Sequence, residues 1–283
     1  MVSGIVPIDP RSETLRLVQS LGARLAGLAI QPYRPNRALA ELLLTSPVRT
    51  MPHILIGHYY DDLSINSCVI DNYGGMYAVT ELLIKHGRKR PAFIGEISLS
   101  STEHERHLGF CMACLHNGIR VPPEHFVQLY HEQDLRARFR ELLNSPTPPD
   151  SLICLFDGLV PNVFKALTSL GVSVPDHISV ASFGNDMDIA EHTRPLLTTA
   201  HHPAGMMGAV AAHQLINEIE GLIPPGPTLW VVPVSLVRAE SCGTLPLGEA
   251  AGKLEPIPFS HHNGVPITLE EASQGGRASG LIK

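Results

Sequence analysis

The sequence predicts an α/β protein built on parallel sheets. Strands alternate with helices along most of the chain, and the strands are short apolar runs of the kind that fill a buried parallel sheet. Glycines such as Gly87 and Gly171 stand where helices should end. Alternation of this kind requires right-handed crossovers, and in such sheets ligands bind beyond the carboxyl ends of the strands.

The alternation is clearest in residues 69–118. After a strand, Asp71 or Asn72 is a suitable N-cap for a helix with one apolar face. Residues 91–95 then form a buried strand, and a second helix follows. Because Asp71 and Arg106 both come after strand ends, they are the first two residues that we expect to touch a ligand.

The other elements are placed by the same rules, and Pro233 marks the last strand as an edge or bulged strand. Residues 244–283 lose the pattern, so we expect an irregular tail there, with a docking segment for a partner as the alternative. The expected strands are 25–30, 53–57, 126–130, 151–156, 178–183 and 228–237, and the expected helices are 13–21, 36–45, 134–144, 158–170 and 203–220.

Composition limits the classes of protein that remain. Of the 283 residues, 44% are hydrophobic and 17% charged, which indicates a globular chain. No apolar run approaches the roughly 20 residues of a membrane span, and no secretory signal is visible. Five irregularly spaced cysteines favour reduced thiols and a cytoplasmic location, and a net charge of -6 excludes this chain alone as an electrostatic clamp for DNA.

Several motifs occur in a fixed order, and together they resemble the effector-binding domain of lactose/galactose-repressor (LacI/GalR) transcription regulators. The similarity in order and spacing extends from near Leu21 to Cys242. The motifs are D-N-x-x-G at 71–75, L-L-x-x-H-G at 82–87, R-x-x-G-F at 106–110, V-P-D-H-I-S-V-A-S-F at 174–183, R-P-L-L-T-T at 194–199 and L-V-R-A-E-S-C at 236–242.

The resemblance implies two doubly wound parallel-sheet sub-domains with a ligand cleft between them, as in type I periplasmic binding proteins. Residues 1–97 and 203–222 would form an N-terminal sub-domain that is incomplete, and residues 98–200 and 228–243 the C-terminal one. Such regulators bind DNA through a helix-turn-helix, which cannot be placed in the first sixty residues. We expect either a truncated sequence or a chain that has lost its DNA-binding domain.

The resemblance also assigns a set of ligand-binding residues. Arg106 would reach into the cleft and bond ligand hydroxyls or carboxylates, unless it is a surface arginine. Asp71 would bind ligand, cap a helix, or do both, and Thr102 would offer a hydroxyl. The remaining assignments are Asp157, Asn185 and His202.

The sequence departs from the family at two of these positions. The family has Asn-Asp where this chain has Phe156-Asp157, and an acidic residue where this chain has Gly184. Because carboxylates usually hold sugar hydroxyls, a common hexose is in doubt. A purine, an acidic metabolite, a modified sugar or no ligand at all remain open.

Metal, cofactor and catalytic chemistry are not expected. His104, His107, Cys111 and Cys114 lie in a line along one predicted helix, which can direct at most two ligands at one ion. No G-x-S-x-G, H-E-x-x-H or phosphate-binding loop occurs. The sequence therefore predicts a cytoplasmic, non-enzymatic, homodimeric effector-sensing module that acts on operator DNA through a helix-turn-helix not present in this chain, with no membrane partner. The alternatives are a solute-binding protein of a transporter, a ligand-binding relative without a DNA reader and, last, an enzyme.

Overall fold

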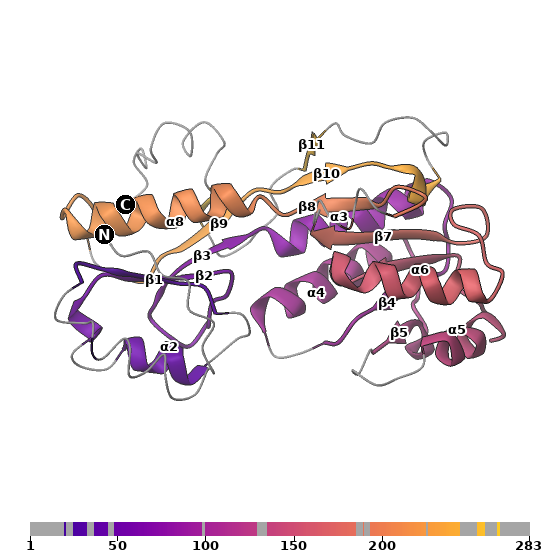
Figure 1. The fold of residues 1–283 in the computed structure, drawn as a ribbon, viewed down its shortest axis with the longest axis horizontal. Coiled ribbons are helices and arrows are strands. Elements are labelled where there is room, and N and C mark those ends of the chain that lie inside the picture. Colours follow the sequence, from indigo (N-terminus) through magenta and orange to yellow (C-terminus); the bar gives the residue numbers. More distant parts are fainter. Residues whose placement is uncertain are drawn as a thin grey trace. The chain divides into compact units, whose positions relative to one another are not determined.

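The structure is a computed structural model of the chain, and Figure 1 shows its fold. Among the described residues, no helix combines the length and the hydropathy that crossing a bilayer requires. The residues that the structure describes are 20, 25–32, 37–44, 48–97, 100–128, 135–184, 189, 193–224, 226–243, 254–257 and 265–266.

The chain folds into two compact units. Unit 1 comprises Met1–Ile70, Ala204–Val232 and His262–Lys283, and unit 2 comprises Asp71–Pro203 and Pro233–His261. The first division therefore falls after Ile70, whereas the sequence analysis set it after residue 97. The physical reason is that the helix following Ile70 packs on the helix and strands of unit 2.

Unit 1 is a five-stranded, wholly parallel sheet of order β1-β2-β3-β9-β12. Helix α2 (Arg37–Leu43) and helix α8 (Ala204–Ile219) lie on opposite sides of this sheet (Figure 1). Leu43 of α2 packs with Leu55 in one buried cluster, while the Cys68 thiol on β3 meets the Met207 carbonyl of α8. The strands are β1 (Leu28–Ile30), β2 (His53–Ile56), β3 (Asn66–Ile70), β9 (Leu229–Val232) and β12 (Val265–Pro266).

Unit 2 holds a seven-stranded sheet of order β11-β10-β8-β7-β6-β4-β5. Its strands from β8 to β5 run parallel, and β10 and β11 add an antiparallel edge. The strands are β4 (Pro91–Ile94), β5 (Phe126–Val127), β6 (Ser151–Cys154), β7 (Ser179–Gly184), β8 (Thr198–His201), β10 (Ser235–Val237) and β11 (Leu254–Pro256).

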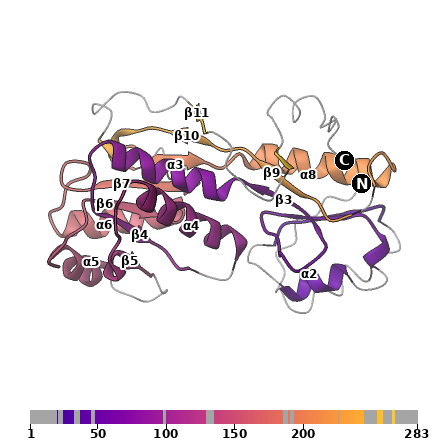
Figure 2. The same ribbon diagram turned by 180° about the vertical axis from the view of Figure 1, so that it is seen from behind.

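Helices cover both faces of this sheet because successive strand side chains point in opposite directions. On one face, the Phe93 ring of β4 packs against the Phe110 ring of α4 (Ser101–His116). Helix α4 packs in turn against α3 (Asn72–Lys85), and Figure 2 shows these two helices side by side. On the other face, Ile94 and Leu152 share a buried cluster with residues of α5 (Leu135–Leu143) and α6 (Val160–Ser169).

Two sequence expectations are corrected, and one strand was missed. Residues 228–237 are not one strand, because β9 and β10 belong to different sheets and Pro233 stands between them. Strand β8 was not predicted. The tail is not wholly irregular, since β11 and β12 each extend a sheet. The expected helix 13–21 lies outside the described residues except for Ser20, which is helical.

Candidate ligand site of unit 2

Several predicted residues gather at the carboxyl edge of the unit 2 sheet. Strands β6, β7 and β8 are neighbours, so Gly184 at the end of β7, and Asp157 and His202 after the ends of β6 and β8, come to the same edge. The backbone N–H of His202 donates to the Gly184 carbonyl over 2.8 Å, which ties two of these strand ends together. The first turns of α4 bring Arg106 to the same place, because Arg106 bonds the carbonyl of Leu155 directly after β6.

Helix α4 begins with a reciprocal cap that fixes the position of Arg106. The Ser100 hydroxyl accepts from the Glu103 N–H over 3.2 Å and donates to the Glu103 carboxylate over 2.6 Å. The first of these bonds satisfies one backbone donor at the start of the helix. Arg106, in the second turn, then faces inward and is only 8% exposed.

Three contacts within unit 2 hold the Arg106 guanidinium. Its Nε donates to the Asn72 side-chain oxygen and its Nη1 to the Leu155 carbonyl, each over 2.9 Å. Its central carbon lies 3.8 Å from the centre of the Phe183 ring, a cation–π distance. Asn72 in turn donates to the Glu105 carboxylate over 3.3 Å. The guanidinium is therefore oriented before any ligand arrives.

One nitrogen of Arg106 remains available for a ligand. Among the described residues, Nη2 makes no hydrogen bond, although the residue as a whole is buried, so this nitrogen is the one that can still donate to a ligand. Burial lowers the pKa of Arg106 to about 10, although the nearby carboxylates of Asp157, Glu103 and Glu105 oppose this shift. The side chain therefore stays cationic at neutral pH and can donate to an acceptor.

Asp157 acts as an internal acceptor in this structure. Its carboxylate accepts from the Ser182 hydroxyl on β7 and, over 2.9 Å, from the Thr199 hydroxyl on β8, and the residue is 2% exposed. A Cβ atom at Gly184 would lie 3.0 Å from the Asp157 Oδ2 atom. The absence of a side chain at position 184 thus leaves room for this carboxylate, and the ligand role of Asp157 stays a prediction.

His202 contributes a neutral imidazole. Burial above all, together with the positive charge of Arg106 and the neighbouring His201, lowers its pKa to about 4. At neutral pH the ring is uncharged and offers one donor and one acceptor. A histidine in this state can bond a hydroxyl or an amide without adding charge to the site.

The other predicted site residues are placed less directly. Asp71 caps α3 by accepting from the Gly74 N–H over 2.7 Å, and it is 1% exposed, so the capping interpretation is confirmed. Thr102 lies half-buried in the first turn of α4. Asn185 lies outside the described residues. Ligand contact by these three residues stays a prediction.

Sequence reasoning missed the two side chains that orient Arg106. Asn72 was considered only as a cap, and Phe183 was treated only as the end of a strand. Both residues belong to motifs that carry the family resemblance, and this membership is the one sequence feature that could have pointed to them. Phe156, beside Asp157, is 44% exposed, so an aromatic face is presented next to these residues.

The glycines of the same motifs permit close packing. A Cβ at Gly75 would lie 2.4 Å from the Phe183 ring, and a Cβ at Gly109 would lie 2.4 Å from the Tyr73 carbonyl oxygen. The first glycine lets Phe183 reach its position under Arg106. The second lets α3 and α4 approach, which brings Asn72 within reach of Arg106.

Among the described residues, no group of three or more His, Cys, Asp or Glu side chains could hold a metal ion. His107 packs its ring against Phe93 and Phe126, and its Nε2 atom lies 3.5 Å from the Cys111 sulfur. Burial raises the pKa of the Cys114 thiol to about 12. His107, Cys111 and Cys114 therefore serve packing in this structure, whereas His104 is exposed.

Comparison with known proteins identifies the family. The model of the periplasmic binding protein-like domain matches residues 80–242, more than half of the chain. The chain belongs to this family. The resemblance to the effector-binding domain of LacI/GalR regulators is confirmed as well, since the curated relatives and solved structures that it matches include regulators of this kind.

One such relative is the arabinose metabolism transcriptional repressor of Geobacillus stearothermophilus, 28% identical over 75% of this chain and 60% of that protein. The cellobiose complex of the transcriptional regulator CelR is 25% identical with a TM-score of 0.70, covering 80% of this chain and 69% of that one. The transcription regulator CcpA of Lactococcus lactis shares the fold, with 24% identity, a TM-score of 0.68 and 81% of each chain covered. The chain spans only 50% to 63% of the length of the curated relatives it matches.

Proposed function

We propose that this chain is the effector-sensing part of a cytoplasmic transcription regulator. It binds a small polar metabolite at the carboxyl edge of the unit 2 sheet, and binding alters how a homodimer holds operator DNA through a helix-turn-helix outside this chain. It carries out no catalysis. The observation that carries the proposal is the oriented guanidinium of Arg106, with Nη2 open to a ligand.

The charges around this site favour a neutral ligand over an acidic one. The positive charge of Arg106 is opposed by the carboxylates of Asp157, Glu103 and Glu105, and His202 is neutral. An anion would gain little net attraction there. A molecule with hydroxyl or carbonyl acceptors and an apolar face, such as a sugar or a nucleobase, suits the guanidinium and the exposed Phe156 ring.

Of these two kinds of ligand, the names of the relatives support a sugar. One regulator acts in arabinose metabolism and another is described with cellobiose bound. We therefore place sugars and modified sugars ahead of purines, and purines ahead of organic acids. A transporter's solute-binding role gains no specific support from the side chains of this site.

A thermal-unfolding screen against sugars, nucleobases, nucleosides and organic acids tests the proposal. A true ligand raises the unfolding temperature in proportion to the logarithm of its concentration above Kd. The matched variants are Arg106→Lys, which should need at least about tenfold more ligand for the same shift, and Arg140→Lys on the exposed side of α5, which should keep the original response. If no compound gives a concentration-dependent shift with the unaltered chain, the sensing function is wrong.

A further inference from the structure

A cavity lies in unit 2 at the amino edge of its sheet, opposite the edge that carries Arg106. It has a volume of about 380 Å³ and is formed by the loops before β4, β5 and β6. Strand β4 begins at Pro91 and β5 at Phe126, so this cavity lies at the amino ends of strands whose carboxyl ends face the Arg106 site. We call it the amino-edge pocket. Its lining residues are Lys89, Arg90, Pro91, Ile119, Arg120, Val121, Pro122, Pro123, His125 and Thr147.

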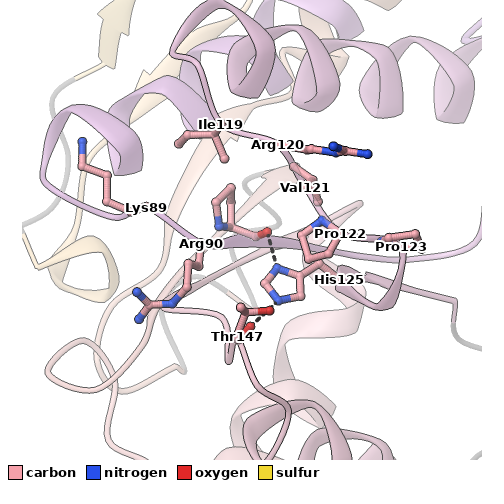
Figure 3. A pocket seen from close by; sticks show the side chains of 10 residues that line it. Lys89, Arg90, Ile119, Arg120, Val121, Pro122, Pro123, His125 and Thr147 are labelled. Atoms are coloured by element: carbon pink, nitrogen blue, oxygen red, sulfur yellow. Dashed lines mark hydrogen bonds between the residues drawn. The ribbon is translucent and has the colours of Figure 1, made fainter.

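His125 fixes the shape of the amino-edge pocket. It is 1% exposed, and its two ring nitrogens lie 3.0 Å from the Pro91 carbonyl and 2.8 Å from the Thr147 carbonyl (Figure 3). One side chain thereby joins all three loops. The prolines have fixed φ angles, which stiffens the walls further. A pocket that is already shaped loses little conformational entropy when a ligand binds.

The lining combines apolar walls with cations and contains no carboxylate. Figure 3 shows Lys89 and Arg90 on one side and Arg120 on the other, with Val121, Pro122 and His125 between them. Among the described residues, the side chains of Lys89 and Arg120 form no ion pair. Arg90 is partly neutralised, because its guanidinium lies 3.7 Å from the Asp150 carboxylate.

Asp150 itself is occupied by the loop backbone. Its carboxylate accepts from the N–H groups of Lys89 and Arg90, over 2.9 and 3.0 Å. This bonding holds the two cationic residues at the pocket, and the carboxylate is not part of the lining. Because no carboxylate among the described residues pairs with Lys89 or Arg120, these two side chains make the rim of the pocket positively charged at neutral pH.

We propose that the amino-edge pocket binds a small organic anion, namely a carboxylate with an apolar ring or chain. The apolar body would pack on the prolines and Val121. Figure 3 shows the charged ends of Lys89 and Arg120 directed outward, so the carboxylate would meet either of them at the rim, after rotation of that flexible side chain. A fully hydrated inorganic ion would gain nothing from the apolar walls, and a neutral apolar molecule would leave the cations unused. The volume lies within the range of small-molecule sites.

Titration with benzoate, followed by the side-chain NMR signals of His125, tests this site. Benzyl alcohol is the neutral control of similar size. A fragment this small should bind with a Kd on the order of millimolar, and benzyl alcohol more weakly. Lys89→Gln and Arg120→Gln should each weaken benzoate binding roughly three- to fivefold, and the double variant about tenfold.

Two controls separate this site from others. Lys165→Gln removes an exposed charge on α6 away from the pocket and should leave benzoate binding unchanged. Arg106→Lys should also leave benzoate binding at the amino-edge pocket unchanged, so the outcome for this pocket does not depend on the proposed effector function. The proposal is overturned if benzoate does not saturate the His125 signal, if benzyl alcohol binds equally well, or if the double variant binds benzoate as the unaltered chain does.

Discussion

The central carbon of the Arg106 guanidinium lies 3.8 Å from the centre of the Phe183 ring. The ring occupies the space left by Gly75 and holds the guanidinium between the Asn72 and Leu155 oxygen atoms. Three separate segments of unit 2 thus orient one cation.

Phe183→Leu should weaken effector binding as well as stability. It removes the ring under Arg106 and leaves a gap at Gly75, and we expect a loss of about 1–2 kcal/mol in the free energy of unfolding. The matched control is Phe93→Leu, at a buried ring of β4 that packs on Phe110. Denaturant unfolding should show similar losses for both variants, and only Phe183→Leu should raise the effector Kd. Equal Kd values would contradict the role of the ring.

Two glycine substitutions should have opposite effects. Gly109→Ala places a Cβ 2.4 Å from the Tyr73 carbonyl oxygen and forces α3 and α4 apart, so it should destabilise unit 2 by roughly 1–3 kcal/mol. Gly208→Ala in α8 meets nothing within 4 Å and should stabilise the chain by about 0.5–1 kcal/mol through helix propensity. Chemical denaturation measures both. If Gly109→Ala left the free energy of unfolding unchanged, α3 and α4 would have to be less closely packed than they are in the structure.

His202 should make stability fall as the solution is acidified. The folded chain holds its pKa at about 4, below the ordinary value of 6.5, so the unfolded chain binds more protons between these pH values. The free energy of unfolding should therefore drop by up to about 1.4 kcal/mol per pH unit as pH falls from 6.5 towards 4, with no contribution above 6.5.

His202→Gln isolates this contribution from those of other histidines. The pKa values of His107 and His201 are also lowered, so the useful quantity is the difference between the variant and the unaltered chain at each pH. That difference should change most between pH 4 and 6.5. A constant difference across this interval would show that His202 titrates equally in both states.

Asp157 and Thr199 should be energetically coupled. The hydroxyl of Thr199 donates to the Asp157 carboxylate over 2.9 Å, and both residues are buried. Asp157→Asn and Thr199→Val should each cost roughly 1–3 kcal/mol, and the double variant should cost less than their sum. Urea unfolding of the four proteins gives the coupling energy. Strict additivity would exclude a bond between these side chains in solution.

The elements that could be predicted from the sequence are those whose ends carry a local signal, such as a capping residue or a glycine. Asp71 begins α3, and Gly87 follows that helix with a φ of 95°, as its place in the sequence suggested. Strand β8 could not be predicted because two of its buried positions are threonines, and hydrophobic periodicity does not reveal a polar strand. Thr198 and Thr199 are buried because their hydroxyls bond the Ala239 carbonyl and the Asp157 carboxylate.

The parts of the site that depend on tertiary contacts could not be predicted. Arg106 was selected from its motif, but its partners Asn72 and Phe183 are 34 and 77 residues away, and a local pattern does not specify such contacts. The same limit applies to Pro233, where the chain leaves one sheet for another. A break in a strand and a change of sheet look alike in a single sequence.

The affinity of Arg106→Lys for the effector found by thermal screening tests the central claim most directly. Lysine keeps the charge but has a single nitrogen in place of the planar fork, which donates from Nε to Asn72 and from Nη1 to Leu155 and leaves Nη2 for a ligand. Isothermal titration should therefore show at least about a tenfold rise in Kd. Circular dichroism should show that the variant remains folded. An unchanged Kd in a folded Arg106→Lys protein would contradict the assignment of this site as the effector site.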